Sequence, residues 1–263
     1  MAATEEPFIR FKNVQKAFGP KVVYSGLDLD IPRGSTTTIL GASGSGKSVM
    51  LKMLIGLFEA DGGEILFDGK DVTKMEEREL YEVRRRVAYL FQGAALFDSL
   101  NVGENVAYGL REQNWNTMKD EEIRHRVAQS LQSVGLPGIE EMRPSDLSVG
   151  MKKRVGLART LALQPEVILY DEPTTGLDPI NTARINHLIV GIKRALGLTS
   201  VVVTHDMGTA FAVSDYIVML GKGRVLMKGT PEELRTTTNP YVRDFIDGKA
   251  PEVEDVDVLL STS

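Results

Sequence analysis

The sequence contains no cysteine among its 263 residues. That absence excludes disulfide bonds, thiolate catalysis and cysteine metal sites together. Long apolar runs are also missing, because the longest stretch without a charge, Gly34–Gly46, is much shorter than the about 18 apolar residues that a membrane-spanning helix needs. The opening M-A-A-T-E-E-P has neither the basic nor the apolar region of an export signal. We therefore expect a cytoplasmic protein.

An excess of positive charge is lacking as well. The formal net charge is -5, and residues 247–263 hold five acids against one lysine. Nucleic-acid binding modules are typically basic, so we expect no nucleic-acid partner. Hydrophobic residues make up 42% of the chain and charged residues 25%, which is typical of a globular domain with a substantial core.

The order of expected elements favours an α/β fold. Short apolar runs alternate with helix-like segments, which is typical of a mainly parallel sheet covered on both faces. Two N-terminal segments instead alternate apolar and polar residues and predict an antiparallel part. The expected strands are Phe8–Asn13, Leu27–Ile31, Thr36–Leu40, Glu64–Asp68, Val167–Tyr170 and Ser200–Thr204, and the expected helices are Val49–Leu57, Lys119–Val134 and Thr182–Leu196.

A glycine-rich loop is the strongest local motif. The run G-A-S-G-S-G-K-S at Gly41–Ser48 matches the phosphate-binding pattern G-x-x-x-x-G-K-[ST], with an apolar strand before it and a helix after it. Such a loop turns backbone N–H groups toward phosphate oxygens, and the helix adds the positive end of its dipole. We expect Lys47 to bridge the β- and γ-phosphates of a nucleotide and Ser48 to ligate Mg²⁺. The residues expected at the nucleotide are Gly41, Ala42, Ser43, Gly44, Ser45, Gly46, Lys47, Ser48 and Val49.

A second element of phosphate chemistry is Val167–Glu172, V-I-L-Y-D-E. Four apolar residues form a buried strand and place Asp171 at its carboxyl end, where sites lie in α/β sheets. Asp171 is expected to hold Mg²⁺ through water, and Glu172 to polarise the attacking water. An apolar strand ending in Asp-Glu is common by itself, but here it follows a phosphate loop.

A third motif narrows the class. No N-K-x-D string, typical of guanine recognition, occurs, whereas Leu147–Met151 reads L-S-V-G-M and precedes the basic residues K-K-R. At this point the sequence resembles the nucleotide-binding subunits of ABC transporters, from about Phe8 to Gly248. The resemblance implies further site residues: Phe18 would stack on adenine and Gln92 would touch Mg²⁺. Ser148 and Gly150 would contact the γ-phosphate of the opposite subunit, and Asp178 would lie in a loop crossing the dimer interface. His205 would be a switch histidine beside the catalytic residues Glu172 and Lys47.

The same resemblance implies an architecture. It is the P-loop NTPase fold of an ABC cassette, with an ATP-binding core in residues 7–92 and 160–240, an inserted α-helical subdomain in 93–159 and a C-terminal extension in 241–263. Each ATP is expected to lie between the phosphate loop of one chain and the signature of another, so the chain is expected to act as a homodimer with ATP and Mg²⁺ as its cofactors.

One residue departs from the family pattern. The usual signature reads L-S-G-G, and Val149 stands where the first glycine is found. A β-branched residue disfavours any positive φ that glycine could supply, although its backbone N–H remains. We interpret the change as tolerated, with an effect on turnover rate.

The segment after Gln92 points to a transporter subfamily. Leu90–Glu112, together with the strings G-M-K-K-R, D-P-I-N-T and N-P-Y-V-R-D-F-I-D-G, closely resembles the ATPases of Mla/Mce-type lipid transporters. This implies phospholipid transport for outer-membrane lipid asymmetry, from the cytoplasmic face of a bacterial inner membrane. The implied partners are integral-membrane permease subunits, an MCE-domain lipid-binding subunit and a small STAS-type regulatory subunit. Ala94–Phe97 is expected to line a groove for a cytoplasmic permease helix.

Two alternatives remain open at the level of sequence. One is an importer of amino acids or another small solute, and the other is a soluble ABC ATPase without a membrane partner, although such proteins usually carry two cassettes or a coiled-coil insertion.

The C-terminal segment is also open to two interpretations. Tyr241–Ile246 has the apolar spacing of a helix that Gly248 would end. Beyond it lies either a solvated acidic tail or a segment that docks on a partner through Val256, Val258, Leu259 and Leu260.

Overall fold

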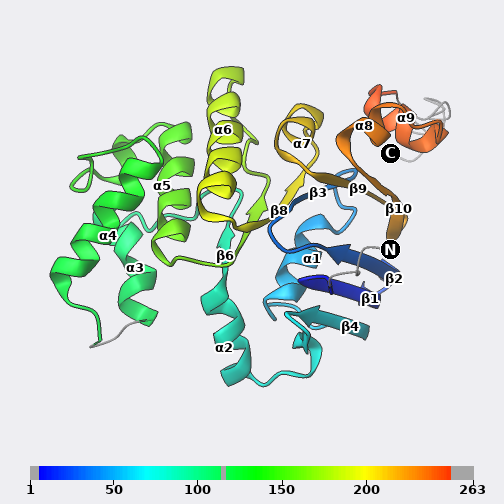
Figure 1. Cartoon of the computed structure of the whole chain (residues 1–263), viewed down its shortest axis with the longest axis horizontal. Coiled ribbons are helices and arrows are strands. Elements are labelled where there is room, and N and C mark those ends of the chain that lie inside the picture. Colours follow the sequence, from blue (N-terminus) through cyan, green and yellow to red (C-terminus); the bar gives the residue numbers. More distant parts are fainter. Residues whose placement is uncertain (1–5, 114–116, 250–263) are drawn as a thin grey trace, which may run out of the picture.

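The computed structural model describes residues 6–113 and 117–249, and these form two β-sheets with helices on their faces (Figure 1). The expected docking residues Val256, Val258, Leu259 and Leu260 lie outside the described residues. No helix in the described part of the chain is long and apolar enough to cross a bilayer.

The larger sheet has six strands in the order β10-β9-β3-β8-β7-β6. Its central pairs are parallel, so that Thr38 of β3 lies opposite Val202 of β8 and Ile217 of β9. Only β10 runs antiparallel, against β9. The strands are β3 Thr36–Leu40, β6 Val87–Leu90, β7 Val167–Asp171, β8 Thr199–Thr204, β9 Tyr216–Gly221 and β10 Arg224–Gly229. Every residue of β3, β7 and β8 is buried, as expected for strands covered on both faces.

The smaller sheet is antiparallel, with the order β2-β1-β4-β5. Its strands are β1 Ile9–Phe18, β2 Lys21–Ile31, β4 Gly62–Phe67 and β5 Lys70–Asp71. The predicted combination of a mainly parallel sheet and an N-terminal antiparallel part is therefore confirmed. The first two strands are longer than predicted, because register shifts between Phe11 and Ala17 break the apolar alternation without ending the pairing.

Helices cover the large sheet and extend beyond one edge of it. In Figure 1, α3, α4 and α5 (green) stand together beside β6, while α1 lies between the two sheets. The helices are α1 Lys47–Leu54, α2 Glu77–Arg86, α3 Val102–Gln113, α4 Asp120–Ser133, α5 Val149–Ala162, α6 Pro179–Leu196, α7 Met207–Val213, α8 Pro231–Arg235 and α9 Pro240–Ile246, with short 3₁₀ turns at Val72–Lys74 and Pro144–Asp146. Leu131, Leu157 and Ile168 belong to one core, which joins these helices to β7.

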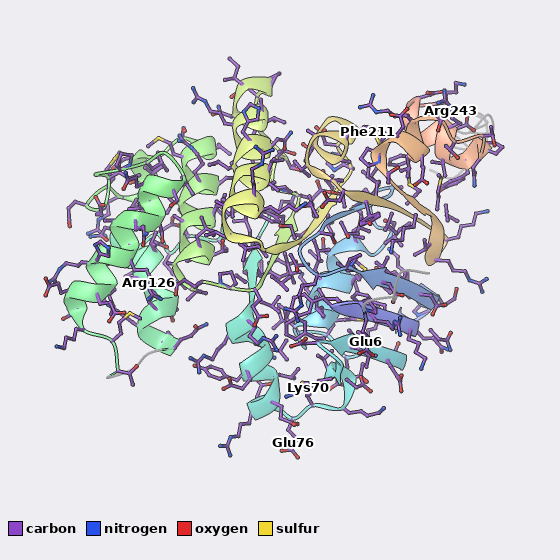
Figure 2. The ribbon with its side chains drawn as sticks, in the orientation of Figure 1. Glu6, Lys70, Glu76, Arg126, Phe211 and Arg243 are labelled. Atoms are coloured by element: carbon purple, nitrogen blue, oxygen red, sulfur yellow. The ribbon has the colours of Figure 1, made fainter. Side chains whose placement is uncertain are left out.

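The last helices pack at the end of the sheet that carries β9 and β10. Figure 2 shows Phe211 of α7 and Arg243 of α9 at this end of the molecule. Arg235 lies over the Phe211 ring, 4.3 Å from its centroid, and its carbonyl accepts a 3.0 Å hydrogen bond from Arg243 Nη1. The helix predicted at Tyr241–Ile246 is present, and Gly248 follows it with a φ of 65°.

Candidate nucleotide-binding site

The glycine-rich loop connects β3 to α1 at the carboxyl end of the parallel strands. Gly46 caps α1 with a φ of 97°, and a Cβ at this position would lie 2.5 Å from Val23 Cγ1. Only glycine fits both restrictions. The Tyr24 hydroxyl donates a 2.7 Å hydrogen bond to the Gly46 carbonyl and so ties the loop to β2. The strand, loop and helix predicted from the motif are confirmed, although α1 ends at Leu54, three residues before the predicted Leu57.

Lys47 folds back over its own loop. Its Nζ donates hydrogen bonds to the carbonyls of Gly41 at 2.8 Å and Ala42 at 3.1 Å. Burial lowers the pKa of Lys47, while Glu172 and Asp171 oppose that shift. In the same loop the buried Ser45 Oγ has no hydrogen-bond partner within the described residues. A cation and an unsatisfied hydroxyl in a cradle of backbone N–H groups fit a bound polyphosphate.

Asp171 ends β7 next to the first turn of α1. Its Oδ1 accepts a 2.7 Å hydrogen bond from Ser48 Oγ, and its Oδ2 accepts another of 2.7 Å from the Tyr89 hydroxyl. A hydroxyl and a carboxylate held this close supply the hard oxygen ligands that Mg²⁺ prefers. Ser48 and Asp171, two of the three residues expected to hold the ion, are therefore in direct contact, while the third, Gln92, lines the same cavity as Ser48. Tyr89 is an addition that the sequence did not indicate.

Glu172 is buried and held from several sides. Its Oε1 lies 3.0 Å from His205 Nδ1 and 4.0 Å from Lys47 Nζ. Its Oε2 accepts hydrogen bonds from Thr175 Oγ1 at 3.0 Å and Thr204 Oγ1 at 3.3 Å. The carboxylate is thus fixed beside the lysine of the phosphate loop, with the two threonines as supports.

Lys47, Ser48, Glu172 and His205 line one cavity of about 550 Å³. It is large enough for a nucleotide, since ligand pockets typically measure about 300–1,000 Å³. Its lining contains predicted residues from five separate segments and adds Lys21 and Val23, which no motif marked. The lining residues are Phe18, Lys21, Val23, Ser43, Gly44, Gly46, Lys47, Ser48, Val49, Gln92, Glu172 and His205.

Seven predicted residues are not part of this lining: Gly41, Ala42, Ser45 and Asp171, which lie within two residues of lining residues in the chain, and Ser148, Gly150 and Asp178, which do not. Ser148 caps α5, where its Oγ accepts a 3.3 Å hydrogen bond from Met151 N, and Asp178 caps α6 by accepting from the N–H groups of Ile180 and Asn181. Gly150 packs against α6, because a Cβ there would lie 3.1 Å from Asn181 Cγ. The two helix starts therefore adjoin each other outside the lining of this cavity.

Val149 is the first residue of α5, and its φ is not positive. The signature therefore does not require the conformational freedom of glycine at this position, and the valine is accommodated. Its side chain is 56% exposed at the helix start.

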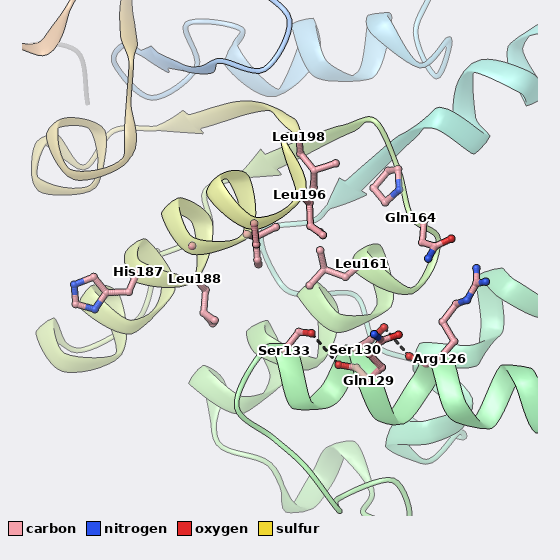
Figure 3. Close-up of a pocket in the computed structure, with 14 residues that line it drawn as sticks. Arg126, Gln129, Ser130, Ser133, Leu161, Gln164, His187, Leu188, Leu196 and Leu198 are labelled. Carbon is pink, nitrogen blue, oxygen red and sulfur yellow. Dashed lines mark hydrogen bonds between the residues drawn. The ribbon is translucent and has the colours of Figure 1, made fainter.

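A larger cavity of about 600 Å³ lies elsewhere, between α4, the end of α5 and α6 (Figure 3). Figure 3 shows Arg126 and Gln129 from α4 on one side and His187 and Leu188 from α6 on the other. The hydroxyl of Ser130 donates a 2.8 Å hydrogen bond to the Arg126 carbonyl of its own helix, so the donor of this hydroxyl is already used within α4. None of the predicted site residues lines this cavity, whereas ten of them line the smaller one.

Comparison with known proteins agrees with this geometry. Residues 24–175 match the family model described as ABC transporter. The chain is 40% identical over 242 residues to the intermembrane phospholipid transport system ATP-binding protein MlaF of Haemophilus influenzae, which covers 92% of this chain and 91% of that protein. It is 44% identical over 241 residues to a probable ribonucleotide transport ATP-binding protein of Mycobacterium leprae, covering 92% of this chain and 69% of that protein.

Solved structures show the same fold. A dimeric ATP-binding cassette in a post-hydrolysis state bound to ADP and Pi has a TM-score of 0.78 and 32% identity, covering 85% of this chain and 98% of that chain. The protein cbiO1 from Clostridium perfringens, part of an ABC transporter complex, has a TM-score of 0.81 and 28% identity, and the match covers 98% of this chain and 100% of that chain. The chain belongs to the ABC transporter family, as an ATP-binding subunit that hydrolyses ATP.

Proposed function

We propose that this chain is the cytoplasmic ATPase subunit of a transporter that moves phospholipid between bacterial membranes. One observation carries the enzymatic part of the proposal. Lys47 Nζ and Glu172 Oε1 lie 4.0 Å apart on a cavity of about 550 Å³ that also contains Phe18, Gln92 and His205. A phosphate-binding cation, a general base and an aromatic surface for adenine therefore surround one space.

Each side chain has a role in this proposal. Lys47 leaves the carbonyls of its own loop to bridge the β- and γ-phosphates, so the loop is arranged for an anion before one arrives. Ser48, Asp171 and Gln92 would hold Mg²⁺, which supplies charge neutralisation at the phosphates when bound. Glu172 accepts a proton from the attacking water, and His205, hydrogen-bonded to that carboxylate, contacts the γ-phosphate.

The signature residues complete the site from a second copy. Ser148, Gly150 and Asp178 lie at the starts of α5 and α6, outside the cavity of their own chain, where backbone N–H groups attract anions. A symmetric head-to-tail pair brings the signature of one chain to the ATP of the other. The dimeric cassette bound to ADP and Pi supports this assembly.

Phospholipid is the cargo that the relatives favour. The MlaF proteins of Haemophilus influenzae and Escherichia coli match over 91% and 89% of their own lengths, whereas the Mycobacterium leprae relative matches over 69% of its length. The proposal includes permease subunits, an MCE-domain lipid-binding subunit and a STAS-type regulatory subunit as partners at the inner membrane. It also assigns residues 7–92 and 160–240 to the ATP-binding core, 93–159 to the helical subdomain and 241–263 to the extension.

The enzymatic proposal is tested with the purified chain, Mg²⁺ and ATP. Glu172→Gln keeps the size and hydrogen bonding of the side chain but removes the proton acceptor. We expect ATP binding to persist and turnover to fall by about 100-fold or more. Lys47→Ala removes the charge at the phosphates and is expected to abolish nucleotide binding, measured by fluorescence of a labelled ATP.

Glu121→Gln, an exposed change on α4, is the matched control and is expected to leave turnover unchanged. Full ATPase activity in the Glu172→Gln protein would refute the assignment of that carboxylate. The cargo is tested separately, by reconstituting the chain with its permease in vesicles: ATP-dependent movement of labelled phospholipid supports the proposal, and ATP-dependent uptake of an amino acid without lipid movement contradicts it.

A further inference from the structure

Lys153 is a buried cation that the proposed mechanism does not use. Its side chain, on α5, is only 4% exposed, although lysine is rarely buried unless it has a partner. Within the described residues its ammonium makes one hydrogen bond, from Nζ to the backbone carbonyl oxygen of Glu172 at 3.1 Å. Burial lowers the pKa of Lys153 to about 8, while the negative charge of Glu172 opposes that shift.

The peptide that accepts this hydrogen bond has an unusual conformation. Glu172 has a φ of 49°, in the left-handed region that residues other than glycine rarely adopt. Its N–H donates to the Val203 carbonyl of β8 at 2.9 Å, and its carbonyl accepts from Lys153. The backbone of Glu172 is thus held from both sides, by the sheet and by α5.

The direction of the Glu172 carboxylate depends on this backbone. The hydrogen bonds from Thr175 and Thr204 reach its Oε2 only while Cα and Cβ keep their present orientation. A charge-assisted hydrogen bond to the carbonyl is stronger than a neutral one, so Lys153 is well suited to hold the peptide in place. The same lysine belongs to the helix that Ser148 caps.

Resting on the role of Glu172 as proton acceptor, we propose that Lys153 is a positioning residue for this carboxylate, joining the signature helix α5 to the hydrolytic centre. Lys153 does not line the nucleotide cavity, and its hydrogen bond within the described residues goes to the Glu172 backbone and not to Ser48 or Asp171. It acts by fixing the Glu172 peptide, and a shift of α5 is transmitted through its side chain to the group that orients water.

The decisive variant is Lys153→Met, which keeps the length of the side chain but removes its charge and its donors. We expect the kcat for ATP hydrolysis to fall by about 10- to 100-fold, because small displacements of a catalytic group have effects of that size. The KM for ATP is expected to stay within about twofold of the wild-type value, since the phosphate loop is untouched. The Tm is expected not to fall substantially, because replacing a buried charge by an apolar side chain is often neutral or stabilising.

Two further variants separate positioning from packing. Lys153→Gln retains an N–H donor and is expected to recover part of the lost kcat. Lys152→Met changes the neighbouring lysine, which is only partly buried, and is the matched control with an unchanged kcat. In the Glu172→Gln background, Lys153→Met is expected to cause no further loss, because the group it positions is already absent.

The outcomes distinguish this inference from the proposed function. Full activity of Glu172→Gln alone would refute the role of Glu172. A slow Glu172→Gln protein combined with a Lys153→Met kcat within twofold of wild type would overturn the role of Lys153. An equal loss from Lys153→Met in both backgrounds would overturn it as well. If Lys153→Met does not fold, the same comparisons with Lys153→Gln decide: a kcat loss confined to the wild-type background supports the inference, and no loss overturns it.

Discussion

The positive φ of Glu172 concentrates backbone strain at the residue that is proposed to activate water. A non-glycine residue in this region costs about 1–3 kcal/mol and persists only where its surroundings determine its conformation. Here the hydrogen bonds from Lys153 and to Val203 do so. In this conformation the Glu172 carboxylate lies 3.0 Å from His205 Nδ1, whereas Asp171 accepts hydrogen bonds from Ser48 and Tyr89. The two carboxylates are adjacent in sequence but contact different partners.

Tyr89 provides a prediction for the neighbouring carboxylate. Its hydroxyl donates a 2.7 Å hydrogen bond to Asp171 Oδ2, while its ring packs 4.4 Å from that of Phe91. Tyr89→Phe removes only the hydroxyl. Because groups that orient a metal ligand typically change metal affinity by about 10–100-fold, we expect the Mg²⁺ concentration for half-maximal ATPase activity to rise by about 10-fold. The measurement is turnover against Mg²⁺ at saturating ATP.

Tyr108→Phe is the control for this change, because Tyr108 is 43% exposed and lies near Phe97 instead of the phosphate site. Its Mg²⁺ dependence is expected to match the wild type. A Mg²⁺ dependence of Tyr89→Phe identical to that of the wild type would show that the Tyr89 hydroxyl does not orient Asp171 and that the side chain contributes by packing alone.

At the scale of elements, the phosphate loop could be predicted because consecutive residues determine it. Val167–Asp171 could be predicted for the same reason, since an uninterrupted apolar run identifies a buried strand. The supports of Glu172 could not, because Lys153, Thr175 and Thr204 come from three segments whose meeting depends on tertiary packing. The short helices α7 and α8 went unpredicted, as did the longer α2 and α3. In α8, five residues are too few to show a helical period.

The loop after Gln92 is another element whose shape depends on distant residues. Ala94 and Ala95 have φ values of 62° and 47°, and their carbonyls accept hydrogen bonds from Arg159 of α5 at 2.6 and 2.8 Å. The same loop presents Phe97, 42% exposed, beside Tyr108 of α3, with 4.6 Å between ring centroids. A loop tied to α5 by Arg159 that carries an exposed aromatic pair fits a groove for a partner helix.

Phe97→Asp tests this groove. A charge among apolar contacts is expected to prevent docking of the permease, because the carboxylate would lose its water without gaining a partner. ATP binding and Tm are expected to stay unchanged, since the side chain lies outside the nucleotide cavity. The measurement is co-purification with the permease, with Tyr81→Asp, 44% exposed on α2, as control. Normal assembly of Phe97→Asp would place the groove elsewhere.

At the scale of the whole molecule, the chain separates the two halves of its site. The cavity holds the phosphate loop, Gln92, Glu172 and His205, whereas the signature at Ser148 lies outside it. This separation could not be derived from motif spacing, because spacing along the chain does not say whether two motifs meet within one copy. Because one chain holds only part of the site, we expect it to hydrolyse ATP only as a dimer.

Ser148→Asp tests that dependence without disturbing the helix. Aspartate caps a helix as well as serine does, so α5 and the Tm are expected to remain as they are. In a dimer, however, the new carboxylate would face the γ-phosphate held by the partner and repel it. With Glu172→Gln to prevent hydrolysis, ATP is expected to produce dimers in light scattering, and adding Ser148→Asp is expected to leave monomers whose affinity for ATP is unchanged. Weakened ATP binding by that monomer would mean that the signature acts within its own chain, and dimers of normal stability would place the interface away from α5.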